Sequence, residues 1–294
     1  MSDLTTSPGS SALAKEQRMR LVVWLLVGLT LPGVLLLALK FLLGARGSEP
    51  TVQNELLTKG IAAFFVALAT WIVARMERRP LDDYGIPLKQ AFGARFWEGC
   101  AWGFAALSVM LLVLRASGHF RIDSVDLTGR PLIGSGLAWA AGFLAVSISE
   151  EFTFRGYLLF LLAKRMRFWP AAVLISVLFG LAHVPNHGET ALGIAQVVGT
   201  GLIFCLMIRR TGNLWLAIGY HAMWDWAQTF FYGTPDSGWV GVGRYLNSSV
   251  QGPDWLTGGS AGPEGSVLAL AVLVLCALLI HLRFPKPIYP DRPV

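Results

Sequence analysis

The chain has 294 residues, of which 54% are hydrophobic and only 14% are charged. A soluble globular domain carries about a quarter charged residues, so this composition excludes an ordinary soluble protein and favours one surrounded by a lipid bilayer. The net charge of +6 comes from basic residues at the ends of apolar runs, which indicates membrane orientation and argues against nucleic-acid binding.

Apolar runs along the chain predict about eight transmembrane helices, because a membrane-crossing helix needs roughly 20 mostly apolar residues. We therefore expect an all-α polytopic membrane protein. Residues 1–20 are expected to form a disordered cytoplasmic tail, 21–284 a single transmembrane domain and 285–294 a second cytoplasmic tail. The predicted spans are residues 21–43, 57–74, 96–114, 137–162, 170–184, 191–208, 214–231 and 267–282.

Lys and Arg residues predict the orientation of these spans, since they concentrate in cytoplasmic loops. Most of the 24 basic residues fall inside if the N-terminus is cytoplasmic. The prediction is a multi-pass protein of the bacterial inner membrane with both termini in the cytoplasm. The Gly- and Pro-rich loop 232–266 is then outside, where its Trp239 and Trp255 fit either aromatic anchors at the headgroups or a lid over a site.

Three charged residues lie inside the fourth predicted span: Glu150, Glu151 and Arg155. Each costs roughly 2.5–3.5 kcal/mol at a helix centre on insertion scales, so we expect them to have a function. Glu151 and Arg155 are four residues apart, on one face where they can pair. Glu150 is rotated by about 100°, has no local partner, and suits a general acid or base. The alternative is a purely structural Arg–Glu pair, which leaves Glu150 unexplained.

Polar residues also interrupt the fifth and seventh predicted spans. His183 lies at the end of the fifth, where a lone histidine is more often an interfacial residue than a catalyst. His221 and Asp225 are four residues apart on the seventh, and such a pair is either a carboxylate-oriented imidazole or half of a metal site. At a rise of about 1.5 Å per residue, these groups and Glu150 reach a similar depth in the cytoplasmic half, which favours one shared site.

The ordered set of motifs resembles the CPBP family of CAAX proteases and bacteriocin-processing proteins, which includes the type II CAAX prenyl endopeptidases. The resemblance covers residues from about 137 to 231 and implies an all-helical intramembrane endopeptidase with a CAAX-protease-like core and a cavity that opens toward the cytoplasm. The motifs read Glu150-Glu151-Phe-Thr-Phe-Arg155, Phe179-Gly-Leu-Ala-His183 and His221-Ala-Met-Trp-Asp225.

By position in these motifs, the resemblance implies that Glu150 and His183 activate the attacking water, while Glu151 and Arg155 hold the geometry of the site. It implies that His221 and Asp225 stabilise the oxyanion or bind a metal. In the CAAX branch the last position is usually Asn, and a carboxylate there repels an oxyanion unless it is protonated or metal-bound. Zinc is a possible cofactor, with His183, His221 and Asp225 as ligands, and a metal-free glutamate mechanism fits these residues equally well.

The sequence therefore predicts an intramembrane endopeptidase that hydrolyses membrane-associated protein or peptide substrates with water activated by glutamate and histidine. No Ser or Cys nucleophile lies beside a base, so no acyl-enzyme is expected. Two alternatives stay open. Buried Glu and His residues also form the proton relays of coupled transporters, and the same fold can serve a non-catalytic scaffold or bacteriocin-immunity protein.

Overall fold

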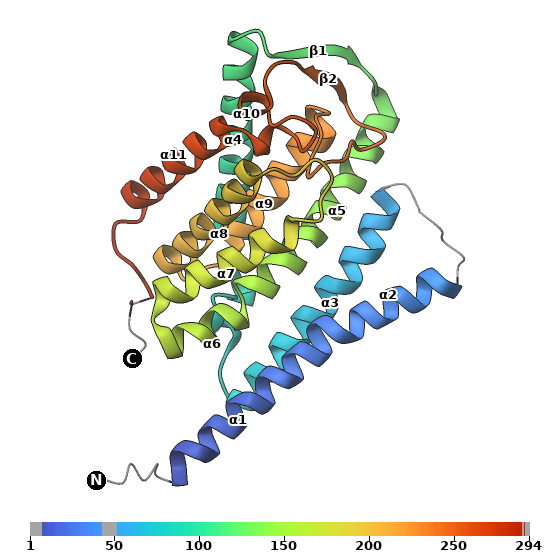
Figure 1. Cartoon of the computed structure of the whole chain (residues 1–294). Coiled ribbons are helices and arrows are strands. Elements are labelled where there is room, and N and C mark those ends of the chain that lie inside the picture. Colours follow the sequence, from blue (N-terminus) through green and yellow to red (C-terminus); the bar gives the residue numbers. More distant parts are fainter. Residues whose placement is uncertain (1–7, 43–51, 290, 292–294) are drawn as a thin grey trace.

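The computed structural model describes residues 8–42, 52–289 and 291, most of which are helical. Figure 1 shows a helical bundle with a small sheet at one end. Helices α1 and α2 are joined by the π-helical turn Leu26–Thr30 and run on as one long element beside α3. In chain order, the α-helices and the two strands of the described residues are α1 Pro8–Leu25, α2 Leu31–Leu42, α3 Val52–Glu77, α4 Ala94–Ala116, β1 Phe120–Val125, α5 Gly129–Phe154, α6 Tyr157–Met166, α7 Phe168–His183, α8 Ala191–Thr211, α9 Trp215–Trp226, β2 Leu246–Val250, α10 Asp254–Thr257 and α11 Val267–Arg283.

Five helical segments of the described chain are long and apolar enough to cross a membrane. Helices α7 and α11 are apolar but shorter, and α9 has only 12 residues before a π-helical turn continues it. The fold is thus consistent with an all-α membrane protein, and the count of eight spans stays a prediction. The five segments are Lys15–Ala38, Leu56–Glu77, Ala94–Ala116, Gly129–Met166 and Ala191–Thr211.

The expectation of a disordered tail over residues 1–20 is wrong from Pro8 onward, where α1 begins; residues 1–7 lie outside the described chain. Distant partners hold this part of α1. Arg20 lies 3.6 Å from a carboxylate oxygen of Glu77, and Arg165 donates to Gln17 at 3.1 Å. Such contacts cannot be read from the local composition of the tail.

Two local features depart from a regular bundle. Strands β1 and β2 pair in antiparallel fashion, with Phe120 opposite Val250 and an irregularity between Ile122 and Ser124. The single span predicted over 137–162 is divided into α5 and α6, because Gly156 leaves the helical conformation at ψ −122°. A Cβ at Gly156 would lie 2.5 Å from the carbonyl oxygen of Phe152, so this break requires glycine.

Close backbone contact between α4 and α9 fixes the position of α9. Gly99 and Gly103 on α4 face the backbone of α9 at Leu216 and Tyr220, and a Cβ at either glycine would overlap a carbonyl oxygen there. Gly219 on α9 faces α4 in the same way. Small residues spaced four apart let membrane helices approach closely. This glycine seam holds the helix that carries His221 and Asp225.

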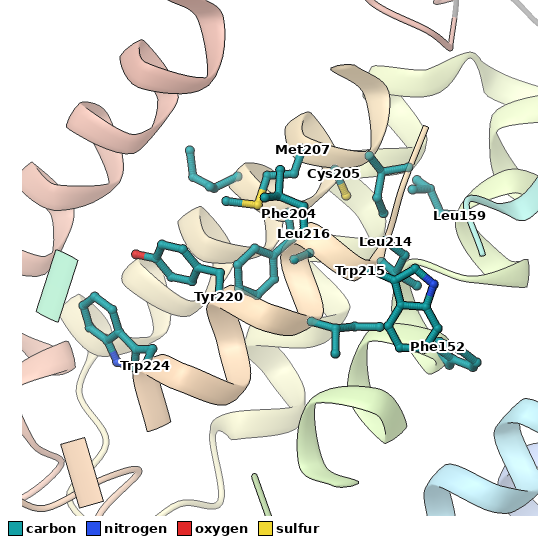
Figure 2. Packing of buried hydrophobic residues seen from close by; sticks show 14 of the residues in the cluster. Phe152, Leu159, Phe204, Cys205, Met207, Leu214, Trp215, Leu216, Tyr220 and Trp224 are labelled. Atoms are coloured by element: carbon teal, nitrogen blue, oxygen red, sulfur yellow. The ribbon is translucent and has the colours of Figure 1, made fainter. Parts of the chain in front are cut away.

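A large apolar core joins α9 to α8 and to the α5–α6 break. Figure 2 shows Phe204, Cys205 and Met207 of α8 close to Leu216 and Tyr220 of α9. All five side chains are at most 3% exposed. The core therefore gives the polar residues of α5 and α9 a rigid apolar frame.

Candidate active site

Side chains from α5, α7 and α9 meet around a cavity of about 410 Å³. Glu150, His183, His221 and Asp225 all line it, so the four groups that the sequence placed at a similar depth lie around one polar space. Glu151 and Arg155 lie beside it and are fully buried. The geometry thus brings together all six residues that were predicted to form the site.

The predicted pair between Glu151 and Arg155 is present on one face of α5. Nη1 of Arg155 donates to both carboxylate oxygens of Glu151 at 3.2 Å. Glu151 also accepts from Nδ1 of His221 at 2.9 Å, with its Oε1 atom. A carboxylate that accepts from one ring nitrogen of a histidine fixes the orientation of the ring and the position of its proton. Glu151 therefore links Arg155, just after the end of α5, to His221 on α9.

An aromatic enclosure surrounds the guanidinium of Arg155. Its Cζ atom lies 4.0 Å from the ring centroid of Phe179 and 5.6 Å from that of Phe204. Cation–π attraction of this kind is strongest where water is excluded. Gly201 leaves the space that Nη2 occupies, because a Cβ there would lie 2.6 Å from it. The enclosure accounts for a buried cation in the middle of a membrane protein.

The other ring nitrogen of His221 faces the cavity carboxylates. Nε2 lies 3.4 Å from Oδ2 of Asp225 and 3.9 Å from Oε2 of Glu150. With Nδ1 committed to Glu151, Nε2 is the atom that can hold or release a proton toward the cavity. His221 and Asp225 therefore act as neighbours across one turn of α9, as their spacing predicted.

His183 is oriented by its own helix. Nδ1 lies 2.8 Å from the carbonyl oxygen of Phe179, and since a carbonyl only accepts, Nδ1 must carry the proton. In the neutral ring Nε2 is then an acceptor. The imidazole also packs edge-on against Phe179, with the ring centroids 4.6 Å apart. His183 thus brings a fixed tautomer to the wall of the cavity.

Lys59 is a site residue that the sequence did not reveal. Its ammonium on α3 donates to Oε1 of Glu150 at 2.9 Å and lines the cavity. The sequence indicated only that Glu150 has no partner on its own helix, and Lys59 supplies one from α3. The sequence signal was weak, because one lysine near the end of a predicted span reads equally well as an anchor at the membrane surface.

The loop 232–266 closes one side of the cavity with Asp236, Ser237 and Trp239. Trp239 packs against Trp139 with the ring centroids 5.6 Å apart and the ring planes tilted by 37°. Trp239 is therefore part of the cavity wall, whereas Trp255 is 60% exposed. The sequence allowed this loop to be a lid over a site or to carry aromatic anchors. The position of Trp239 fits a lid, and the exposure of Trp255 fits an anchor.

A partly buried carboxylate holds this loop in place. Oε1 of Glu264 accepts from the backbone N–H of Ser237 at 2.7 Å, and its other oxygen contacts the amide of Gln228. Asp236 accepts from the hydroxyl of Thr229 at 2.9 Å. Burial raises the pKa of Glu264 well above its usual range, and the nearby Asp236 carboxylate raises it further. The sequence left both carboxylates unassigned, because a Gly- and Pro-rich loop gives no regular spacing.

The depth of the cavity in the membrane depends on the predicted orientation of the spans. The loop 232–266 borders the cavity, and so does Lys59 near the start of α3. Helix α6 continues to Met166, beyond the predicted span end at residue 162. The place in the cytoplasmic half and the cytoplasmic opening stay predictions.

The three predicted zinc ligands, His183, His221 and Asp225, do not form a metal centre. Within the part of the chain that the structure describes, no three His, Cys, Asp or Glu side chains are grouped so as to hold a metal ion. A cation, Lys59, already lies against Glu150 in the same cavity. Histidine and aspartate are ordinary zinc donors, but these three side chains are not grouped around a common point in the described structure.

Residues 133–227 match the family model described as type II CAAX prenyl endopeptidase Rce1-like. A comparison with curated proteins finds no match. The matched segment contains all six predicted site residues, and the matched model describes a family of proteases, so the resemblance inferred from the motifs is confirmed. The match supports a place for this chain in the CAAX-protease-like family, and residues 133–227 carry that relationship.

Proposed function

We propose that the protein is an intramembrane endopeptidase that hydrolyses peptide bonds of membrane-associated protein or peptide substrates. The observation that carries this proposal is the shared cavity of Glu150, His183 and His221, which come from three different helices. A carboxylate and two imidazoles around one polar space are the groups that general acid–base catalysis requires.

In the proposed reaction a water molecule lies between Glu150 and the acceptor nitrogen of His183. Glu150 takes one proton from this water as the oxygen attacks the peptide carbonyl carbon. The same carboxyl group then gives that proton to the nitrogen of the leaving amine, and the peptide C–N bond breaks. The products are a new amine and a new carboxylic acid, whose remaining water proton passes to the amine or to solvent on release, with no covalent intermediate on the enzyme.

The oxyanion of the tetrahedral intermediate needs donors. Lys59 can supply one, and Nε2 of His221 can supply another when the ring is doubly protonated, since Nδ1 already donates to Glu151. Both lie within 3.9 Å of the Glu150 carboxylate, on the cavity side. Charged and polar donors aimed at a developing negative charge are usually the largest single contribution to catalysis. Asp225 cannot supply this stabilisation as an anion, so its proposed role is to position His221, whose Nε2 it approaches at 3.4 Å.

Location and partners follow from this proposal. The candidate spans support a multi-pass membrane protein, and the basic residues support both termini in the cytoplasm of a bacterial inner membrane. The partners are the bilayer and a substrate that reaches the cavity from the membrane; no nucleic acid is involved.

The experiment uses the purified full-length protein in detergent with a fluorogenic peptide that carries a prenylated cysteine four residues from its C-terminus. Glu150→Gln should lower cleavage by about 10²–10⁴-fold, the usual contribution of a general base. Glu98→Gln, at a surface ion pair on α4, is the matched control and should cleave normally. The C-terminal fragments of membranes that contain wild type or Glu150→Gln extend the test to other substrates.

Cleavage that persists in Glu150→Gln would contradict the proposal. The break between α5 and α6 beside the site gives one specific reason to test transport as well, because interrupted helices line transporter sites. Proton-gradient-dependent flux that Glu150→Gln abolishes, without any proteolysis, would favour a proton-coupled transporter. A phenotype unchanged by Glu150→Gln would favour a non-catalytic scaffold or immunity protein.

A further inference from the structure

A second cavity, of about 640 Å³, lies at the other end of α3, away from the candidate active site. It is lined by the last turns of α3 and by the segment that follows, up to Lys89. Its basic side chains are Arg75, Arg78, Arg79 and Lys89. None of these residues belongs to the segment that matches the family model.

Positive charge dominates the wall of this cavity. Against the four cations, Asp82 is the one carboxylate among the described residues that line it. Asp83, close by, lies 3.6 Å from Nε of Arg79 and is 41% exposed, so it offsets only part of this charge. A concave surface of one sign raises the local concentration of ions of the opposite sign.

The backbone at Arg78 indicates that a cation is retained here at a cost. Arg78 has a φ of +55°, the left-handed conformation, and Arg79 N–H bonds back to the carbonyl of Ala74 at 2.9 Å. This is the C-terminal cap at which helices normally carry glycine. A side chain in this conformation costs roughly 1 kcal/mol relative to glycine, so the position favours Gly on backbone grounds and yet holds Arg.

The apolar part of the wall distinguishes a lipid from a soluble anion. Trp71 is 46% exposed and Leu88 is 57% exposed, and both line the cavity. The guanidinium of Arg75 lies 5.3 Å from the Trp71 ring centroid. Helix α3 is a candidate membrane span that ends at Glu77. Tryptophan and arginine at the end of a span lie at the level of the lipid headgroups.

We propose that this cavity binds the phosphate of an anionic phospholipid headgroup, with Arg75, Arg78 and Lys89 around the phosphate and Trp71 and Leu88 against the first acyl carbons. Free phosphate shares the charge but makes no use of the apolar wall. Basic pockets beside membrane helices bind anionic headgroups on the same physical grounds. The site is independent of the proposed peptidase activity.

The test measures binding to the purified full-length protein in neutral detergent by native mass spectrometry. The added probes are dioleoylphosphatidylglycerol, dioleoylphosphatidylcholine and inorganic phosphate, each in a separate titration. Wild type should bind phosphatidylglycerol more tightly than either other probe. Arg78→Gly should bind it about fivefold more weakly, and Arg78→Gly with Arg75→Gln about 25-fold more weakly, since each cation near anionic lipid contributes a factor of about five.

Weaker lipid binding by Arg78→Gly cannot be attributed to unfolding if the thermal midpoint of this variant is unchanged or higher. We expect that result, because glycine relieves the strain of the left-handed conformation at this cap. Arg115→Gln is the matched control: this exposed arginine lies in the last turn of α4, at the opposite end of the bundle. Equal loss in Arg115→Gln would overturn the proposal in favour of diffuse surface charge. Equal binding of phosphatidylcholine, or of inorganic phosphate, would overturn it as well.

Discussion

The ammonium of Lys59 on α3 lies 2.9 Å from Oε1 of Glu150 on α5. This contact joins the two helices across 91 positions of the chain. The lysine side chain is 35% exposed and the glutamate 18%, so the ion pair lies at the edge of the cavity rather than in the core. Its main effect is to place a positive charge beside the carboxylate that the proposed mechanism uses as a base.

Replacing Lys59 with Met should lower proteolysis by about 10²–10³-fold, the usual effect of removing one donor to an oxyanion. Because the pair is partly exposed, the free energy of unfolding should change by less than about 1 kcal/mol. Cleavage rate and thermal midpoint of the purified protein measure the two effects separately. Lys59→Arg, which keeps the charge, should recover part of the activity. Full activity in Lys59→Met would remove Lys59 from the mechanism.

Arg155→Met should reduce the free energy of unfolding by about 3–5 kcal/mol, because it leaves the buried Glu151 carboxylate without its cation. Denaturant unfolding in detergent measures this loss. Adding Glu151→Leu to the same protein should restore part of the stability while activity stays lost. Arg283→Met, at a surface pair with Glu98, is the control and should cost less than about 1 kcal/mol. A similar cost for both arginines would contradict the buried pair.

Gly103→Ala should destabilise the protein by about 1–3 kcal/mol, because the added methyl group overlaps the backbone of α9 at Tyr220. The displacement of α9 should also lower activity through His221. Gly134→Ala is the matched control on α5, where no atom lies within 4 Å of the added carbon. That change should be neutral or stabilising by about 0.5–1 kcal/mol. Thermal midpoints that fall equally in both variants would contradict the seam.

Stability should fall as pH rises, through the titration of Glu264. Its pKa in the folded protein lies well above the ordinary value of 4.5, so the folded state holds this proton more tightly than the unfolded state. The contribution is therefore present at acid pH and is lost as pH rises from about 4.5 through the raised value. Thermal midpoints across pH 5–8 should decline in wild type and less steeply in Glu264→Gln. Parallel curves for the two proteins would contradict this account.

The local part of the site could be predicted from the sequence because helix geometry is regular. Glu151 with Arg155 and His221 with Asp225 are each four residues apart, and the structure has both contacts. The order of the motifs also indicates the family segment, which the match over residues 133–227 confirms. Apolar runs located the helices in the same way, since a membrane span has a fixed minimum length.

The other features of the site depend on contacts between segments that are far apart in the chain, and residue spacing does not predict such contacts. Lys59 reaches Glu150 from a different helix, and Ser237 with Glu264 draws an irregular loop over the cavity. The division of α5 from α6 follows from one glycine inside an apolar run, and hydropathy does not register it. Depth estimates depended on predicted span ends, and α6 extends past one of them to Met166.

The segment that matches the family model contains only some of the residues that line the cavity. Residues 133–227 carry the acid, the imidazoles and the buried ion pair, while Lys59 precedes this stretch and Asp236 and Glu264 follow it. A related protein could therefore keep every motif and yet surround the same carboxylate with a different counter-charge. Differences in substrate preference and in working pH between such relatives would then originate in the flanking helices and loops, not in the shared motifs.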